Sequence, residues 1–161
     1  DDRYCAGDPN PDFYYGLNVK LSYRNWDFGF NGHGSIGYKV FNDFASNHST
    51  AYFDVNAGNL PNFATAVKRT GFTQISGDYQ FFSDFYLENA SFFRMDDINL
   101  GYTFKEIGNW QGNIRVAASC QNVFVITNYS GIDPEINSTD GVDRTFWPRP
   151  RTFSVRLNVN F

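Results

Sequence analysis

The sequence predicts an all-β fold of five antiparallel strands, and three observations support this prediction. Apolar and polar residues alternate with a period of two in five separate segments. Aromatic residues, which favour strands, make up 19% of the 161 residues. Two of the connections between the segments are short, as expected where consecutive strands pair antiparallel.

The first two strands are predicted over residues 15–23 and 26–38. In the first, the odd positions from Tyr15 to Tyr23 are apolar, whereas the positions between them are small or polar. In the second, apolar residues from Trp26 onward alternate with polar residues and glycines. Two residues separate the segments, which is a tight-turn length for a hairpin.

The other three strands are predicted over residues 98–104, 114–126 and 153–161. The middle one alternates less strictly, whereas the last alternates without a break up to Phe161. Helix signals are weak, and only residues 62–68 are expected to form a short helix inside a loop. No domain boundary is visible, so residues 1–161 are interpreted as one continuous segment.

The lengths of the connections point to a membrane sheet. Residues 24–25 and 105–113 form short connections, whereas residues 41–89 and 127–150 form long ones. Short and long connections alternate along the chain, so all the short ones lie at one end of an antiparallel sheet. Outer-membrane barrels are built this way, with short periplasmic turns and long extracellular loops. By the same parity, the last residue would lie in the periplasm, and the chain would begin within an extracellular loop of a longer protein.

The two faces of the predicted strands have opposite polarity. A Lys or Arg side chain in mid-bilayer lipid would cost about 2–4 kcal/mol, so the polar face would line an enclosed interior. Aromatic residues near the strand ends, among them Trp26 and Phe104, fit interfacial girdles. A soluble β-sandwich satisfies the same alternation with the faces reversed, and that alternative stays open. Five strands cannot close a barrel, so a membrane sheet would need strands from elsewhere in the polypeptide.

Composition excludes several classes of protein. Thirteen basic residues against 17 acidic ones disfavour nucleic-acid binding. No apolar run approaches the roughly 20 residues of a membrane-spanning helix. The N-terminal residues do not resemble a signal peptide. Cys5 and Cys120 have no metal-type spacing, and we expect both thiols to be free.

Four segments, covering about half of the chain, resemble the C-terminal portion of SusC/RagA-type TonB-dependent outer-membrane transporters. They are residues 7–30, 91–104, 115–136 and 141–161. The most specific motifs are NLGYTF at 99–104, QNVFVITNYSGIDPE at 121–135 and PRPRTF at 148–153, the last of them leading into a strand that ends on Phe161.

The resemblance implies a 22-stranded barrel with an N-terminal plug, of which these residues would be the last five strands. It implies that TonB drives the uptake of oligosaccharides (glycans), or of peptides in some members, across the bacterial outer membrane. It also implies a SusD-like surface lipoprotein as a lid over the barrel. The plug, the earlier strands and the motif pulled by TonB are expected to lie outside this chain. No enzymatic activity and no cofactor are implied.

No catalytic or metal site is expected. His33, on a polar strand face, and His48, in a loop, belong to no triad pattern. Asp96 and Asp97 are neighbours in a strand, so they are expected to point to opposite faces rather than form an acid–base pair. The acidic residues of the last loop could bind calcium, but their spacing matches no EF-hand, and a locally hydrogen-bonded loop is favoured. These residues are Asp133, Glu135, Asp140 and Asp143.

Two sets of residues are candidates for function. Aromatic side chains in the long connections could contact the substrate or the lid, although packing of the loops themselves is the favoured alternative. This set contains Tyr52, Tyr79, Tyr86, Tyr129 and Trp147. The second set resembles the signal by which the barrel-assembly machinery recognises a final strand. It contains Val155, Leu157, Val159 and Phe161.

Overall fold

A computed structural model describes residues 4–48, 50–51, 66–73, 84–108, 110–136, 140–144 and 147–161. The chain divides into two compact units, although the sequence shows no boundary between them. The sheet unit comprises Phe13–Ile36, Phe92–Thr127 and Arg149–Phe161. The loop unit comprises Asp1–Asp12, Gly37–Ser91 and Asn128–Pro148. It is therefore built from the two long connections and the residues before the first strand.

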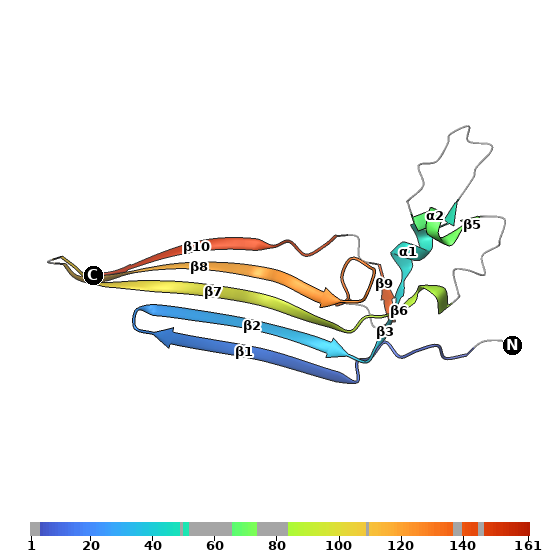
Figure 1. Ribbon diagram of the computed structural model, residues 1–161, viewed down its shortest axis with the longest axis horizontal. Coiled ribbons are helices and arrows are strands. Elements are labelled where there is room, and N and C mark those ends of the chain that lie inside the picture. Colours follow the sequence, from blue (N-terminus) through green and yellow to red (C-terminus); the bar gives the residue numbers. More distant parts are fainter. Residues whose placement is uncertain are drawn as a thin grey trace, which may run out of the picture. The chain divides into compact units, whose positions relative to one another are not determined.

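The sheet unit is one five-stranded antiparallel sheet, which confirms the predicted fold class (Figure 1). Its strands follow one another in the order β1, β2, β7, β8, β10. Their bounds are Phe13–Tyr23, Trp26–Ile36, Phe92–Ile107, Trp110–Thr127 and Thr152–Asn160, respectively. Arg24 and Asn25 form the turn between β1 and β2 as expected, and Arg24 has a positive φ of 55°.

The strand ends differ from the predicted ones for local reasons. β2 stops at Ile36, two residues early, because Gly37 has a φ of 85° and leaves the extended conformation. β7 and β8 are longer than expected, with 16 and 18 residues. The first part of β7 was hidden because a bulge interrupts the alternation between Met95 and Asp97. A second register shift, between Lys105 and Ile107, interrupts the pattern near the turn that joins β7 to β8. The connection between them is reduced to residues 108 and 109.

The pairing register gathers the apolar side chains on one face of the sheet. One cross-strand row contains Trp26, Tyr102, Val116 and Leu157, and the next contains Phe28, Leu100, Ala118 and Val155. These rows do not form a core, because Val155 is 80% exposed and Leu157 is 64% exposed. A soluble sandwich formed by these residues alone would bury this face against a second sheet, so the exposed rows favour the membrane sheet over that alternative.

The opposite face carries polar and charged side chains. Asp27 on β2 and Arg115 on β8 are joined across β7 by a two-point ion pair, in which Arg115 Nε lies 3.0 Å from Asp27 Oδ1. Gly101 of β7 lies beneath the pair. A Cβ atom there would be 2.5 Å from both Arg115 Nη2 and Asp27 Oδ2, so the glycine leaves the room that the ion pair occupies.

The loop unit has its own small sheet, in the order β6, β3, β9. β3 (Lys39–Asn42) pairs antiparallel with β6 (Leu87–Asn89) and parallel with β9 (Val142–Asp143). Because β9 comes from the second long connection, this sheet joins both connections into one folded body. The remaining elements are α1 (Asp43–His48), β4 (Thr50–Ala51), α2 (Ala66–Thr70), β5 (Phe72–Thr73) and the short 3-10 helix η3 (Asp84–Tyr86).

Two further expectations concern helices and thiols. The helix expected at residues 62–68 overlaps α2 at residues 66–68, and its first four residues lie outside the described part. Among the described residues, no helix has the length and apolar character needed to cross a bilayer. Cys5 and Cys120 are both free, as expected.

Candidate functional site

A carboxylate clamp holds the two long connections together inside the loop unit. Glu88 on β6 accepts hydrogen bonds from Asn42 Nδ2 at 3.1 Å and from Ser130 Oγ at 2.6 Å. Its other oxygen accepts the backbone N–H of Ser130 at 2.7 Å. Asn42, at the end of β3, also caps the first turn of α1 through Ala45 N. One glutamate therefore fixes β3, β6 and the start of the second connection.

Two buried tyrosines add hydrogen bonds inside the loop unit, and the bond made by Tyr38 also joins the two long connections. Tyr38 donates its hydroxyl to the carbonyl oxygen of Pro134 at 2.9 Å. Tyr129 donates its hydroxyl to Asp143 Oδ2 at 2.7 Å, and Asp143 is only 1% exposed. The pKa of Tyr129 is raised above its ordinary value of 10.0, first because the ring is buried and second because of this hydrogen bond. The neutral phenol is thus the form that the folded loop unit stabilises.

The structure buries two of the aromatic residues predicted to contact a ligand. Tyr86 is 3% exposed, in edge-to-face contact with Phe41 and Phe85, and Tyr129 is 6% exposed. Their rings pack the loop unit, which is the alternative that the sequence favoured for these aromatic residues. Trp147 is 85% exposed and stays a predicted contact residue. Tyr52 and Tyr79 lie outside the described residues.

Three of the four acidic side chains of the last connection, those of Asp133, Asp140 and Asp143, each accept a hydrogen bond from a different group. Asp133 accepts the backbone N–H of Glu135, and Asp143 accepts the Tyr129 hydroxyl. Asp140 pairs with Arg144 at 2.8 Å, and this hydrogen bond holds the pKa of the Asp140 carboxyl below its ordinary value. Within the described ranges, no group of three or more potential ligand side chains could hold a metal ion. Local hydrogen bonds hold Asp133, Asp140 and Asp143, as the favoured interpretation of the sequence predicts.

A second polar cluster lies on the polar face of the sheet unit, where two neighbouring strands each carry an extra residue. Asp96 is the extra residue of β7 against β2, because Asn31 pairs with Asp97 and Gly32 with Met95. β8 carries its own extra residue opposite Asp96, and Asn122 there has a φ of 51°, which asparagine tolerates.

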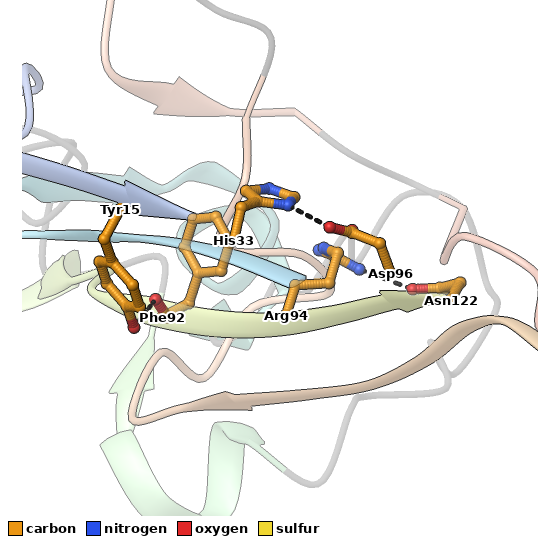
Figure 2. A network of polar contacts seen from close by, with 6 residues as sticks. All are labelled: Tyr15, His33, Phe92, Arg94, Asp96 and Asn122. Atoms are coloured by element: carbon orange, nitrogen blue, oxygen red, sulfur yellow. Dashed lines mark hydrogen bonds and ion pairs between the residues drawn. The ribbon is translucent and has the colours of Figure 1, made fainter. Parts of the chain in front are cut away.

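The two bulges turn polar side chains toward one another (Figure 2). Asp96 Oδ2 lies 2.6 Å from His33 Nδ1. Arg94, which is buried, donates from Nη1 to Asn122 Oδ1 at 2.8 Å. Asn122 Nδ2 in turn donates to the carbonyl oxygen of Arg149 at 2.7 Å. The cluster thereby ties the residues that lead into β10 to the centre of the sheet.

The bulge overturns the expectation that Asp96 and Asp97 point to opposite faces. Asp97 accepts a hydrogen bond from Asn99 on the polar face, and Asp96 reaches His33 on that same face. The extra residue breaks the two-residue period, so neighbouring carboxylates share a face. Arg94 and Asn122 were missed by the sequence reasoning. The interrupted alternation around residues 94–97 was the available signal.

Comparison with known proteins finds relatives that match almost the whole chain. No family model matches the sequence. The TonB-dependent receptor SusC of Bacteroides thetaiotaomicron is 37% identical over 169 residues, which cover 99% of this chain and 16% of SusC. The TonB-dependent receptor P3 of Formosa agariphila is 29% identical over 99% of this chain and 17% of that receptor. The chain thus spans about one sixth of the length of these relatives.

Solved structures agree on the fold. The RagAB peptide transporter matches with a TM-score of 0.70 and 20% identity over 95% of this chain and 17% of the matched chain. The RagAB peptide importer in its closed-closed state matches with a TM-score of 0.68 and 17% identity over the whole of this chain. The chain is a fragment of a SusC/RagA-type TonB-dependent receptor.

Membership of this receptor family assigns the two faces of the sheet. SusC/RagA-type receptors are β-barrel proteins of the outer membrane, and this fragment belongs to that membrane. The exposed apolar face therefore meets the hydrocarbon of the bilayer, where backbone groups must be paired within the sheet. The polar face, with the Asp27–Arg115 pair and the bulge cluster, belongs to the interior of the receptor.

Proposed function

We propose that the receptor containing this fragment is an active importer that takes up glycans across the outer membrane. The observation that carries the proposal is the 37% identity to SusC, which extends over 99% of the fragment. In this proposal, TonB supplies the energy through a part of the receptor outside residues 1–161. A SusD-like lipoprotein covers the barrel as a lid and helps to capture the oligosaccharide.

The fragment has a structural role in this importer. Residues 1–161 form the C-terminal segment of the barrel wall, and the plug and the first 17 strands of a 22-stranded barrel come from the rest of the polypeptide. The sheet unit supplies the wall, and the loop unit supplies part of the extracellular surface. The Glu88 clamp supports this division, because it holds both connections in one shape instead of leaving them as separate loops.

Trp147 is the described residue best suited to touch the substrate or the lid. It is 85% exposed in the loop unit, and an indole ring offers a flat apolar face for a sugar ring. Tyr52 and Tyr79 complete the proposed contact set. A peptide is the alternative substrate, and the observation in its support is the likeness of the fold to the RagAB peptide importer.

Uptake by cells tests this proposal. In a strain lacking the receptor gene, the full-length receptor should restore uptake of a labelled oligosaccharide mixture, and a second deletion of tonB should abolish it. Trp147→Ala should lower uptake, whereas Phe85→Ala, which removes another exposed ring of the loop unit, should not.

Three outcomes are informative. Restored uptake of the oligosaccharides supports a glycan importer. Restored uptake of labelled oligopeptides instead would assign a peptide substrate. If neither uptake depends on the receptor, or if uptake persists without TonB, the proposed function is wrong.

A further inference from the structure

A shallow apolar groove lies on the membrane-facing side of the sheet unit. Its volume is about 510 Å³, and its surface is almost entirely apolar. It is lined by Trp26, Leu100, Gly101, Tyr102, Phe104, Val116 and Ala118. Trp26 directly follows the first tight turn, and Phe104 precedes the second by four residues, so the groove lies toward the short-turn end of the sheet.

The groove exists because large side chains on β7 stand beside small ones on β8. Tyr102 lies directly opposite Val116, and Leu100 lies directly opposite Ala118. The Tyr102 ring is held by edge-to-face contacts with Trp26 and with Phe104, both with ring centroids 4.7 Å apart. The rings of Trp26, Tyr102 and Phe104 therefore form one side of the groove, and Ala118 contributes only a methyl group to its floor.

We propose that this groove binds one acyl chain of an outer-membrane phospholipid. The groove is continuous with the face that meets bilayer hydrocarbon, and none of its lining side chains is charged. The aromatic rings of Trp26, Tyr102 and Phe104 stand beside the small side chain of Ala118, so a flexible hydrocarbon chain finds contacts along the whole groove.

The position of the aromatic residues selects the part of the lipid that binds. Trp and Tyr side chains gather where hydrocarbon meets the headgroups, because one end of the ring is apolar and the other is polar. Trp26 and Tyr102 lie near the short turns, which face the periplasm in outer-membrane barrels. The bound lipid would therefore come from the periplasmic leaflet, with its headgroup beside Trp26.

Packing, rather than the hydrophobic effect, would retain the lipid. Free lipid tails are as apolar as the groove, so the gain comes from close contacts with a preformed surface. The substitution Ala118→Phe fills the floor with an aromatic ring while keeping the membrane face apolar. Because the added ring takes the place of lipid contacts along the floor, lipid occupancy should fall by about tenfold.

Native mass spectrometry of the full-length receptor measures this occupancy. The receptor would be purified in mild detergent with added phosphatidylethanolamine, and the lipids retained on each folded barrel would be counted. We expect Ala118→Phe to lose one retained phosphatidylethanolamine. Val155→Phe is the matched control, because Val155 lies opposite Ala118 on the same face but outside the groove lining. It should retain the lipid.

Equal retention by the wild type and Ala118→Phe would overturn the proposal. A change in the number of receptor copies per assembly, with lipid retention unchanged, would also overturn it and would identify a second copy as the occupant. Both variants must show the heat-modifiable migration of a folded barrel. If Ala118→Phe does not fold, Ala118→Leu offers the same test with a smaller side chain.

Discussion

At the scale of single residues, one glycine leaves room for a charged pair on the interior face of the sheet. Gly101 lies under the bond between Asp27 and Arg115, and each of these two side chains is about one third exposed. The three residues come from three different strands. An ion pair in such a setting gives modest stability by itself, so the geometry of the site matters more than the charges alone.

Replacing Gly101 should therefore destabilise the receptor. We expect Gly101→Leu to lower the free energy of unfolding by about 1–3 kcal/mol, because its Cβ would overlap both partners of the ion pair. Gly16→Leu is the matched control, since the nearest atom to a Cβ there is 4.0 Å away. Denaturant unfolding of the full-length receptor in detergent measures both. Equal losses in the two variants would contradict the role given to Gly101.

The contribution of the buried hydrogen bond between Tyr129 and Asp143 to stability can be measured separately. Tyr129→Phe should destabilise the loop unit by about 1–3 kcal/mol, because Asp143 loses a donor in a buried place. Tyr4→Phe removes a bond of the same 2.7 Å length, to Asp84, at an exposed place, and should change little. The rate of protease cleavage within residues 128–136 measures the difference. Similar cleavage of both variants would show that the buried hydrogen bond stabilises the loop unit no more than the exposed one.

The same tyrosine predicts a dependence on pH. Since folding raises the pKa of Tyr129, its contribution to stability is complete below the ordinary value of 10.0 and is lost as the pH rises above it. Subtilisin resistance of the loop unit should therefore be constant up to about pH 9 and fall as the pH rises from about 10 to about 12. In Tyr129→Phe this part of the fall should be absent. An identical fall in wild type and variant would assign the alkaline sensitivity to other groups.

At the scale of elements, the two bulges determine how the chain enters the last strand. The extra residue of β8 gives Asn122 a left-handed conformation and aims its amide at the backbone of Arg149. Arg94 donates a hydrogen bond to the oxygen of the same amide group. The connection before β10 is thus positioned by strands that precede it by more than twenty residues.

Removing the Asn122 side chain should loosen this entry. Asn122→Gly keeps the positive φ accessible but removes the side-chain hydrogen bonds to Arg94, Arg149 and Pro150, so trypsin should cleave after Arg151 faster than in the wild type. Asn160→Gly is the control, because it removes an exposed hydrogen bond to Asn113 at the other end of β10. Unchanged cleavage in Asn122→Gly would mean that the cluster does not position the connection.

The last strand carries the prediction about assembly. Deleting Phe161, which is fully exposed, should reduce the amount of folded receptor in the outer membrane if the terminal aromatic residue is read by the assembly machinery. Phe161→Tyr keeps an aromatic end and should assemble normally. Heat-modifiable migration in outer-membrane fractions measures both. Normal amounts of folded receptor without Phe161 would contradict the role of this residue as an assembly signal.

The five long strands were predicted from their alternation, and their ends were predicted best where the alternation is strict. β10 was placed within one residue at each end, because no bulge interrupts its alternation from Phe153 to Val159. β7 was shortened by six residues at its start, because the extra residue Asp96 reverses the phase of the pattern. The parallel pairing of β3 with β9 was invisible, since it joins Phe41 to Val142 across a hundred residues.

The candidate site was less predictable than the sheet. Burial of Tyr86 and Tyr129 depends on the folding of both long connections into one unit, and no local pattern reports that event. The Glu88 clamp depends on the same long-range pairing. By contrast, the polarity of each sheet face follows from the two-residue period alone, so it could be stated in advance.

At the scale of the whole molecule, the account depends on which solvent meets each face of the sheet. The apolar rows that end at Val155 and Leu157 are exposed in the isolated fragment, which is costly in water and favourable in hydrocarbon. The alternating residues Arg156 and Asn158 would be costly in hydrocarbon. Family membership and the physics of the strands thus require the same orientation.

Spin labels along β10 of the full-length receptor test this orientation most directly. Cysteines at Val155 and Leu157 should carry labels that collide with dissolved oxygen, which concentrates in lipid. Cysteines at Arg156 and Asn158 should carry labels protected from oxygen and reached from the aqueous interior. An alternating pattern with this phase is the predicted result, whereas uniform access to water, or the reverse phase, would contradict the membrane-wall assignment.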